Sequence, residues 1–117
     1  QIDRAADALA VFSKSASGND RNGLLIWRAD IYFAGSKYRE AASMCRGVLA
    51  LRDATQDSKA HAEYQLGVCY HNSNMDLAAR QAMENVTKRY SGLDWASKAR
   101  GMLHLWNTYG VQKNNQR

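Results

Sequence analysis

Tyr64-Gln65-Leu66-Gly67-Val68-Cys69-Tyr70 is the stretch of this 117-residue chain from which the fold can be predicted. A leucine and a glycine stand side by side in it, and a tyrosine follows the glycine three positions later. Three residues make nearly one helical turn, so Gly67 and Tyr70 share a face. A small residue lets a second helix approach closely, and a large ring fills the adjacent space. The stretch therefore predicts a helix that is packed closely against another helix.

Copies of this pattern recur along the chain. The interval from Gly67 to Gly101 is the same as the interval from Ala62 to Ala96. Small residues that return at a fixed interval of about 34 residues are typical of repeated pairs of helices. Further matches at similar intervals extend the pattern towards the N-terminus. The pair Ala29 and Tyr32 corresponds to Gly67 and Tyr70. The pair Ala8 and Phe12 corresponds to Ala41 and Cys45.

The small residues also predict which helices touch. Close approach of two antiparallel helices requires a small side chain on both sides of the contact. We expect Gly67 to meet Ala79, and Ala29 to meet Ala41, because each pair is separated by one predicted turn. Cys45 and Cys69 fall on apolar helical faces without CxxC spacing, so they are expected to be small buried hydrophobic residues rather than zinc ligands or a disulfide framework.

Periodicity and turn residues predict an all-α chain. Proline is absent and no stretch alternates polar and apolar residues over the length of a strand. Asn19, Asp20 and Asp57 are candidate N-caps, and residues 110–117 form a polar tail that is expected to fray. We expect a single domain over residues 1–117 with about six helices, at 3–16, 22–34, 37–50, 58–72, 75–89 and 93–109.

This pattern resembles the tetratricopeptide repeat. In that family the first helix of each repeat (A) carries Leu-Gly and then an aromatic residue, and the second helix (B) carries Ala and further apolar residues. The resemblance implies a right-handed superhelical solenoid of antiparallel helix pairs, which here would have the phase B-A-B-A-B-A. The matching residues are Leu66, Gly67, Tyr70, Ala79, Met83 and Val86 in the best copy, and Leu25, Ala29, Tyr32, Tyr38, Ala41, Cys45 and Val48 in another.

One turn of the chain is similar to a subset of that family. Residues 89–99 resemble the inter-repeat turn of bacterial envelope members, in which a proline usually follows the tyrosine. Ser91 replaces this proline here. The resemblance leans towards a bacterial protein outside the cytoplasm, in the periplasm, the envelope or the medium. The chain begins at Gln1 without an initiator methionine, which indicates a processed product or an excised piece.

The resemblance also implies where a ligand would bind. Family members bind ligands on the concave face, along the A helices. Members that grip an acidic C-terminal peptide use Lys, Arg and Asn there, and only Lys98 fits this pattern, so an apolar helix or an extended peptide is the expected partner. The alternative is that individual positions belong to the core between helices. The positions are Ile26, Asp30, Phe33, Tyr64, Val68, His71, Lys98, Met102 and Leu105.

The sequence contains no pattern typical of catalysis. His61 and His71 are ten residues apart on one predicted helix, about 15 Å, which is too far for one metal ion. No glycine-rich phosphate loop is present, and no motif places a nucleophile beside a base. We therefore predict a non-enzymatic scaffold for protein–protein interaction that needs no cofactor.

A second hypothesis is a structural subunit that assembles with itself. In the predicted phase the first B helix lacks its A, and the last A helix lacks its B. Head-to-tail pairing of these two ends does not close as a dimer, so it would build a filament or a ring. The residues of this contact would be Ala5, Ala8, Leu9, Val11 and Phe12 at one end, and Leu103, Trp106 and Tyr109 at the other.

A third hypothesis is binding to an anionic polymer. The formal net charge is +5, and residues 80–117 carry seven basic and two acidic side chains. Tyr90, Trp95 and Trp106 lie among them. No predicted helix has a dense basic stripe, however, so nucleic acid is not the expected partner. No apolar run approaches the length of a membrane span, so no membrane insertion is expected, and Asn85-Val86-Thr87 matches a glycosylation sequon.

Overall fold

Five α-helices follow one another between residues 18 and 115, the part of the chain that the computed structural model describes. No strand occurs within these residues, so the predicted all-α class is confirmed. The first predicted helix, at 3–16, lies outside the described residues. The helices are α2 (Gly18–Ala34), α3 (Tyr38–Ala50), α4 (Gln56–Asn72), α5 (Asp76–Arg89) and α6 (Asp94–Asn115).

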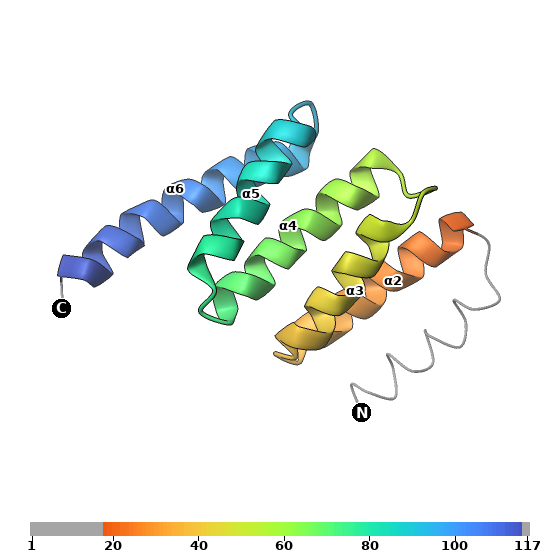
Figure 1. Cartoon of the computed structure of the whole chain (residues 1–117), viewed down its shortest axis with the longest axis horizontal. Coiled ribbons are helices and arrows are strands. Elements are labelled where there is room, and N and C mark those ends of the chain that lie inside the picture. The colour runs from red at the N-terminus through yellow and green to blue at the C-terminus, as the bar shows by residue number, and fades with distance from the viewer. Residues whose placement is uncertain (1–17, 116–117) are drawn as a thin grey trace.

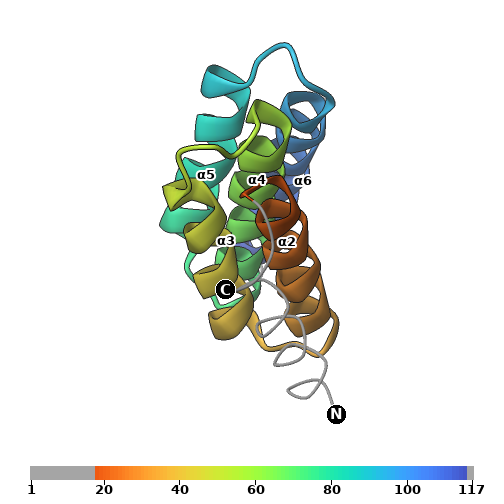
Figure 2. The ribbon, with the colours of Figure 1, turned by 90° about the vertical axis from the view of Figure 1, so that its right-hand side faces the viewer.

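The described helices are arranged in two layers. Consecutive helices run antiparallel and pack side by side (Figure 1). Helix α4 also contacts α2 on one side and α6 on the other, so these three form one layer, and α3 and α5 form the other (Figure 2). Within the described part of the chain α3 and α5 do not contact each other. Helix α4 contacts the other four described helices, so it is the centre of the structure.

Three helix ends differ from the sequence prediction by two residues or more. Helix α2 begins at Gly18 rather than at residue 22, so Asn19 and Asp20 lie within the helix and are not its N-cap. Thr55, rather than Asp57, caps α4, because its hydroxyl oxygen accepts a hydrogen bond of 3.0 Å from the backbone N–H of Ser58. Asp57 lies in the first turn instead, where a carboxylate favours the positive end of the helix dipole. Helix α6 continues to Asn115 rather than ending at residue 109, since a polar sequence without proline does not by itself stop a helix. The predicted polar tail is therefore helical as far as Asn115.

The core consists of two clusters of mostly small side chains on either side of α4. Ala29 and Ala41 are both buried in the cluster that α2, α3 and α4 share, as predicted. Met83 and Val86 are fully buried in the cluster of α4, α5 and α6. Cys45 and Cys69 are free thiols and both are buried, which confirms their prediction as small hydrophobic residues.

Gly67 marks the closest approach of α4 to α5. A Cβ atom built on Gly67 would lie 2.9 Å from Met83 Cε, 3.2 Å from Ala82 Cβ and 3.3 Å from the Ala79 carbonyl oxygen. Cβ atoms essentially never approach another heavy atom within 3.0 Å. The predicted contact of Gly67 with Ala79 is confirmed, and any larger residue at position 67 requires Met83 or α5 to shift.

A polar contact also joins α4 to α5. Glu63 is buried, and Asn85 Nδ2 donates a hydrogen bond of 3.4 Å to its carboxylate. Burial raises the pKa of Glu63, and the bond from Asn85 and the charge of Arg89 oppose this shift. Asn85 Oδ1 accepts a second bond, of 3.1 Å, from Gln81 Nε2. The nitrogen that a glycan would modify in the sequon is therefore engaged inside the folded helix pair.

Candidate functional site

The nine positions that the resemblance assigned to a ligand groove all lie in one layer. Three lie on each of α2, α4 and α6, and α4 contacts the other two helices of this layer. Asp30, His71, Lys98 and Leu105 are exposed. Half-buried are Ile26, Phe33, Tyr64, Val68 and Met102. This mixture of exposed and half-buried side chains means that the layer presents apolar surface to solvent without being part of the closed core.

Aromatic stacking defines one end of the boundary between α4 and α6. His61 of α4 stacks on Trp95 of α6, with ring centroids 4.2 Å apart and planes 9° apart. Tyr64 lies tilted against the same indole at 5.4 Å, and Lys98 Nζ is 4.3 Å from its centroid. Because aromatic and cation–π contacts each stabilise by about 0.5–1.5 kcal/mol, these four side chains hold one another in a defined arrangement.

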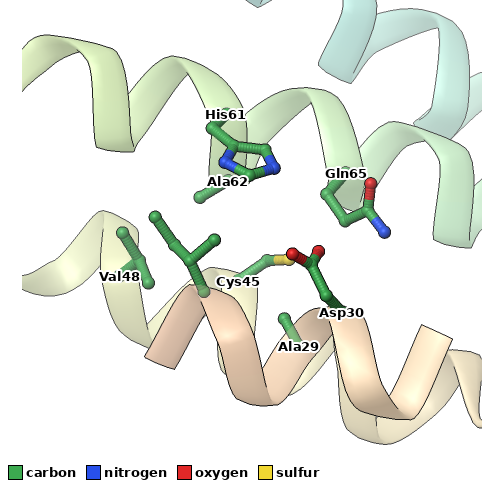
Figure 3. A pocket seen from close by; sticks show the side chains of 8 residues that line it. Ala29, Asp30, Cys45, Val48, His61, Ala62 and Gln65 are labelled. Atoms are coloured by element: carbon green, nitrogen blue, oxygen red, sulfur yellow. The ribbon is translucent and has the colours of Figure 1, made fainter. Parts of the chain in front are cut away.

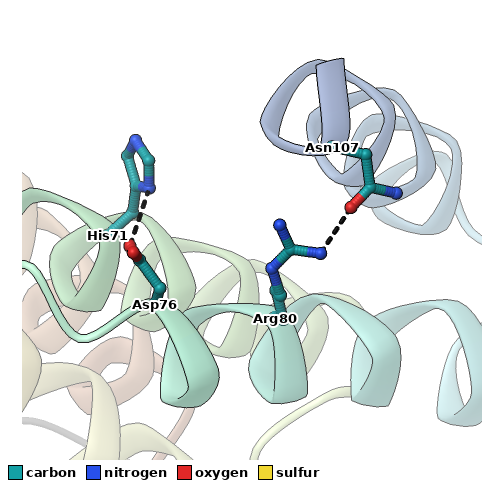
Figure 4. Close-up of polar contacts among 4 residues, drawn as sticks. All are labelled: His71, Asp76, Arg80 and Asn107. Carbon is teal, nitrogen blue, oxygen red and sulfur yellow. Dashed lines mark hydrogen bonds and ion pairs between the residues drawn. The ribbon is translucent and has the colours of Figure 1, made fainter. Parts of the chain in front are cut away.

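A second stack lies further along the same two helices. His71 of α4 stacks on Trp106 of α6, at 4.5 Å and 14°. His71 Nδ1 is also 3.9 Å from a carboxylate oxygen of Asp76 at the start of α5, and Arg80 of α5 donates a hydrogen bond to Asn107 of α6 (Figure 4). The polar contacts of α5 therefore fix the part of α6 that carries Trp106.

Apolar side chains fill the space between the two stacks. Val68 of α4 and Met102 of α6 pack against the core cluster that contains Met83. Leu105 follows on α6 with 47% of its surface exposed. We name this surface the α4–α6 strip and define it by Tyr64, Val68, His71, Lys98, Met102 and Leu105 with the stacked residues His61, Trp95 and Trp106. It is an apolar and aromatic surface whose one lysine, Lys98, lies over the ring of Trp95.

The α2 end of the layer is nearly closed. Ile26 and Asp30 of α2 face His61 and Gln65 of α4 across a crevice that is too narrow to admit a water molecule (Figure 3). Burial raises the pKa of Asp30, and the charge of His61 opposes this shift. Burial also lowers the pKa of His61, against Asp30 and Asp57, which favour its protonation. Asp30 of α2 and His61 of α4 therefore interact electrostatically across the crevice, which has no room for a ligand.

We expect the titration of His61 to make the stability of this layer sensitive to acid. The folded pKa lies below the ordinary value of 6.5, so the unfolded chain takes up the proton first as the pH falls. Urea denaturation from about pH 7.5 to about pH 5 should therefore show wild type losing stability relative to His61→Phe, which keeps a stackable ring without a titrating nitrogen. A constant difference between the two proteins over this range would contradict this assignment.

The structure brings together residues that sequence reasoning separated. The sequence offers a signal for His61, because it shares the helical face of Tyr64 and Val68 at spacings of three and seven. His61 and Trp95 are also separated by the interval that separates Gly67 from Gly101, so equivalent positions on α4 and α6 meet in this stack. Phe33 of α2 packs against the other layer instead, because its ring lies edge-on to that of Tyr38 of α3, with ring centroids 5.4 Å apart.

The residues expected for head-to-tail assembly are only partly described. Leu103 and Trp106 both pack against the chain's own core cluster, so their surfaces are in part already covered. Ala5, Ala8, Leu9, Val11 and Phe12 lie outside the described residues, as does the side chain of Tyr109. Three of the seven basic residues of the third hypothesis are engaged in separate contacts, Arg80 with Asn107, Lys98 with Trp95 and Arg100 with Ser97.

Metal-ligand clusters and membrane spans are both absent from the described part of the chain. No three His, Cys, Asp or Glu residues there are grouped so that they could hold a metal ion. None of the described helices is long and apolar enough to span a bilayer. No protein-family model matches the sequence, and no curated protein is similar enough to count as a relative. A function can therefore be inferred only from the residues of this chain.

Proposed function

We propose that the chain is a helical-repeat scaffold of tetratricopeptide type. The support is the agreement between the repeat interval in the sequence and the packing of the helices. The pairs α2–α3 and α4–α5 are antiparallel, and α6 continues the layer of first helices. In the phase that we propose, α2, α4 and α6 are A helices, and α3 and α5 are B helices, within a right-handed solenoid.

We propose that this scaffold binds an apolar peptide or helix of another protein along the α4–α6 strip, without catalysing a reaction. The observation that carries the proposal is the pair of His–Trp stacks with the exposed Leu105 beside them. Aromatic side chains that are already fixed lose little conformational entropy when a partner binds, and such residues dominate binding energy at interfaces.

Selection from a random peptide library on the purified chain tests this proposal. We expect enrichment of peptides with apolar residues at helical or alternating spacing. Leu105→Glu should weaken their binding by at least about tenfold, because a carboxylate at a half-exposed position would be desolvated in the complex. Fluorescence anisotropy with the selected peptides gives the affinity ratio.

Leu77→Glu is the matched control. It makes the same change at a residue of α5 that is 86% exposed and belongs to the other layer. It should leave the affinity unchanged. Equal losses in both variants, or no loss in either, would rule out the α4–α6 strip as the binding surface. Light scattering of the same samples should give a mass near 13.1 kDa. Large species that persist on dilution would instead favour head-to-tail assembly.

A further inference from the structure

A hollow lies on the face of the molecule opposite to the layer of α2, α4 and α6. It holds about 420 Å³ and is formed by α3, the end of α4 and the turn before α5. It exists because α3 and α5 do not contact each other, so α4 is left uncovered between them at this end (Figure 1). We name it the α3–α4 hollow, and its lining is Tyr38, Arg39, Ala42, Arg46, Cys69, Tyr70, Ser73 and Met75.

The walls of the hollow carry positive charge and no negative charge. Arg39 and Arg46 are seven residues apart on α3, which places them on one face, about 10 Å apart along the axis. Arg46 Nη1 donates one hydrogen bond of 3.3 Å to the Tyr70 hydroxyl. Arg39 has no hydrogen-bond or ion-pair partner among the described residues. Both guanidinium groups therefore keep free donors at the mouth of the hollow.

The floor between the two arginines is uncharged. Ala42 is buried, and its small side chain leaves the space that the hollow occupies. Cys69 is buried beside it, and burial raises the pKa of its thiol to about 11, so it carries no charge near neutral pH. Met75 closes one side with half of its surface exposed. A ligand would meet apolar surface in the centre and at this edge.

We propose that the α3–α4 hollow binds an acidic peptide in which an apolar residue lies between two carboxylates. An extended peptide places side chains i and i+4 on one side about 13 Å apart, with residue i+2 between them. The two flexible arginines can reach that spacing, and charge-assisted bonds from guanidinium to carboxylate are among the strong hydrogen bonds of proteins. The volume fits a few side chains of a ligand. The proposal does not depend on the α4–α6 strip.

A capped, fluorescein-labelled peptide with the sequence Ser-Glu-Ser-Leu-Ser-Glu-Ser is the probe, and fluorescence anisotropy measures its affinity. We expect Arg39→Ala and Arg46→Ala each to weaken binding by about tenfold, since each removes one charge-assisted contact. A peptide with both glutamates replaced by glutamine should lose most of its affinity. Raising the salt from about 50 mM to about 300 mM should weaken the glutamate peptide but not a purely apolar contact.

Arg100→Ala is the matched control, because it removes the same charge from exposed α6, outside the hollow. It should leave the affinity within about twofold of wild type. Arg39→Ala removes no hydrogen bond or ion pair between described residues, so circular dichroism should show the wild-type melting temperature, and this result would exclude unfolding as the cause of the weaker binding. The proposal is overturned by an equal loss in Arg100→Ala, by equal binding of the glutamine peptide, or by no binding of the glutamate peptide at about 1 mM.

Discussion

Replacing Gly67 by leucine should lower the free energy of unfolding by about 3 kcal/mol or more. The first atom of the new side chain would already lie 2.9 Å from Met83 Cε and 3.3 Å from a backbone oxygen of α5. The Met83 side chain is fully buried and has little room to move aside, and the carbonyl oxygen of Ala79 belongs to the backbone of α5, so the further atoms of a leucine would push α5 away. Since α4 contacts all the other described helices, the displacement affects both core clusters. Urea denaturation followed by circular dichroism measures the loss.

Gly101→Leu is the control for this substitution. Gly101 lies in α6 with a helical backbone, and nothing lies within 4 Å of a Cβ atom built there. The same change should therefore stabilise the chain by up to about 0.8 kcal/mol, because leucine is the better helix former. Two substitutions of the same kind should thus have opposite signs. A loss of similar size at both positions would show that the approach of α5 to Gly67 is not the cause of the effect.

Truncating Met83 to alanine should cost about 2–5 kcal/mol. Met83 is the largest of the fully buried side chains described, and it lies where α4, α5 and α6 share their core cluster. Alanine loses the buried methylene and sulfur contacts and leaves a cavity that rigid helices cannot close. Met83→Leu keeps nearly the same volume and should cost less than about 1.5 kcal/mol. Thermal and urea denaturation of the three proteins give the comparison.

The effects of substitutions at Gly67 and Met83 on stability should be coupled. This coupling distinguishes a direct contact between the two positions from a general weakening of the core. Gly67→Ala places a Cβ against Met83 Cε, and Met83→Ala removes that atom. The double variant should therefore be more stable than the sum of the single changes predicts, by about 0.5 kcal/mol or more. Additive effects would show that Ala82 and the Ala79 carbonyl oxygen, rather than Met83, set the limit on residue size at position 67.

Helix α4 connects the two surfaces for which we propose partners. Its side towards α6 carries Tyr64 and His71 of the α4–α6 strip, and Cys69 and Tyr70 contribute to the α3–α4 hollow. Side chains that succeed one another within a helical turn point in different directions, so one helix can serve two opposite surfaces. A variant that binds neither class of peptide but remains folded would therefore be traced first to a displacement of α4.

Much of the fold follows from the sequence by itself. The small residues at Ala29, Ala41, Gly67 and Ala79 predicted which faces are buried, because helical periodicity and the size of a side chain are local properties. The turn residues located most boundaries of the described helices to within four residues, but not the end of α6, where no turn residue stops the helix before Asn115. The sequence also placed the nine groove positions on three helices that share a layer, through a resemblance that stays a prediction.

Only the tertiary structure decided which side chains meet across helices. The stacks of His61 on Trp95 and His71 on Trp106, the bond from Asn85 to Glu63 and the hollow beneath Arg39 depend on the offset between neighbouring helices. Local periodicity fixes the direction in which a side chain leaves its own helix, but not how far the next helix slides or tilts against it. That offset is set by the packing of all the buried side chains together, with Gly67 and Met83 at the tightest contact.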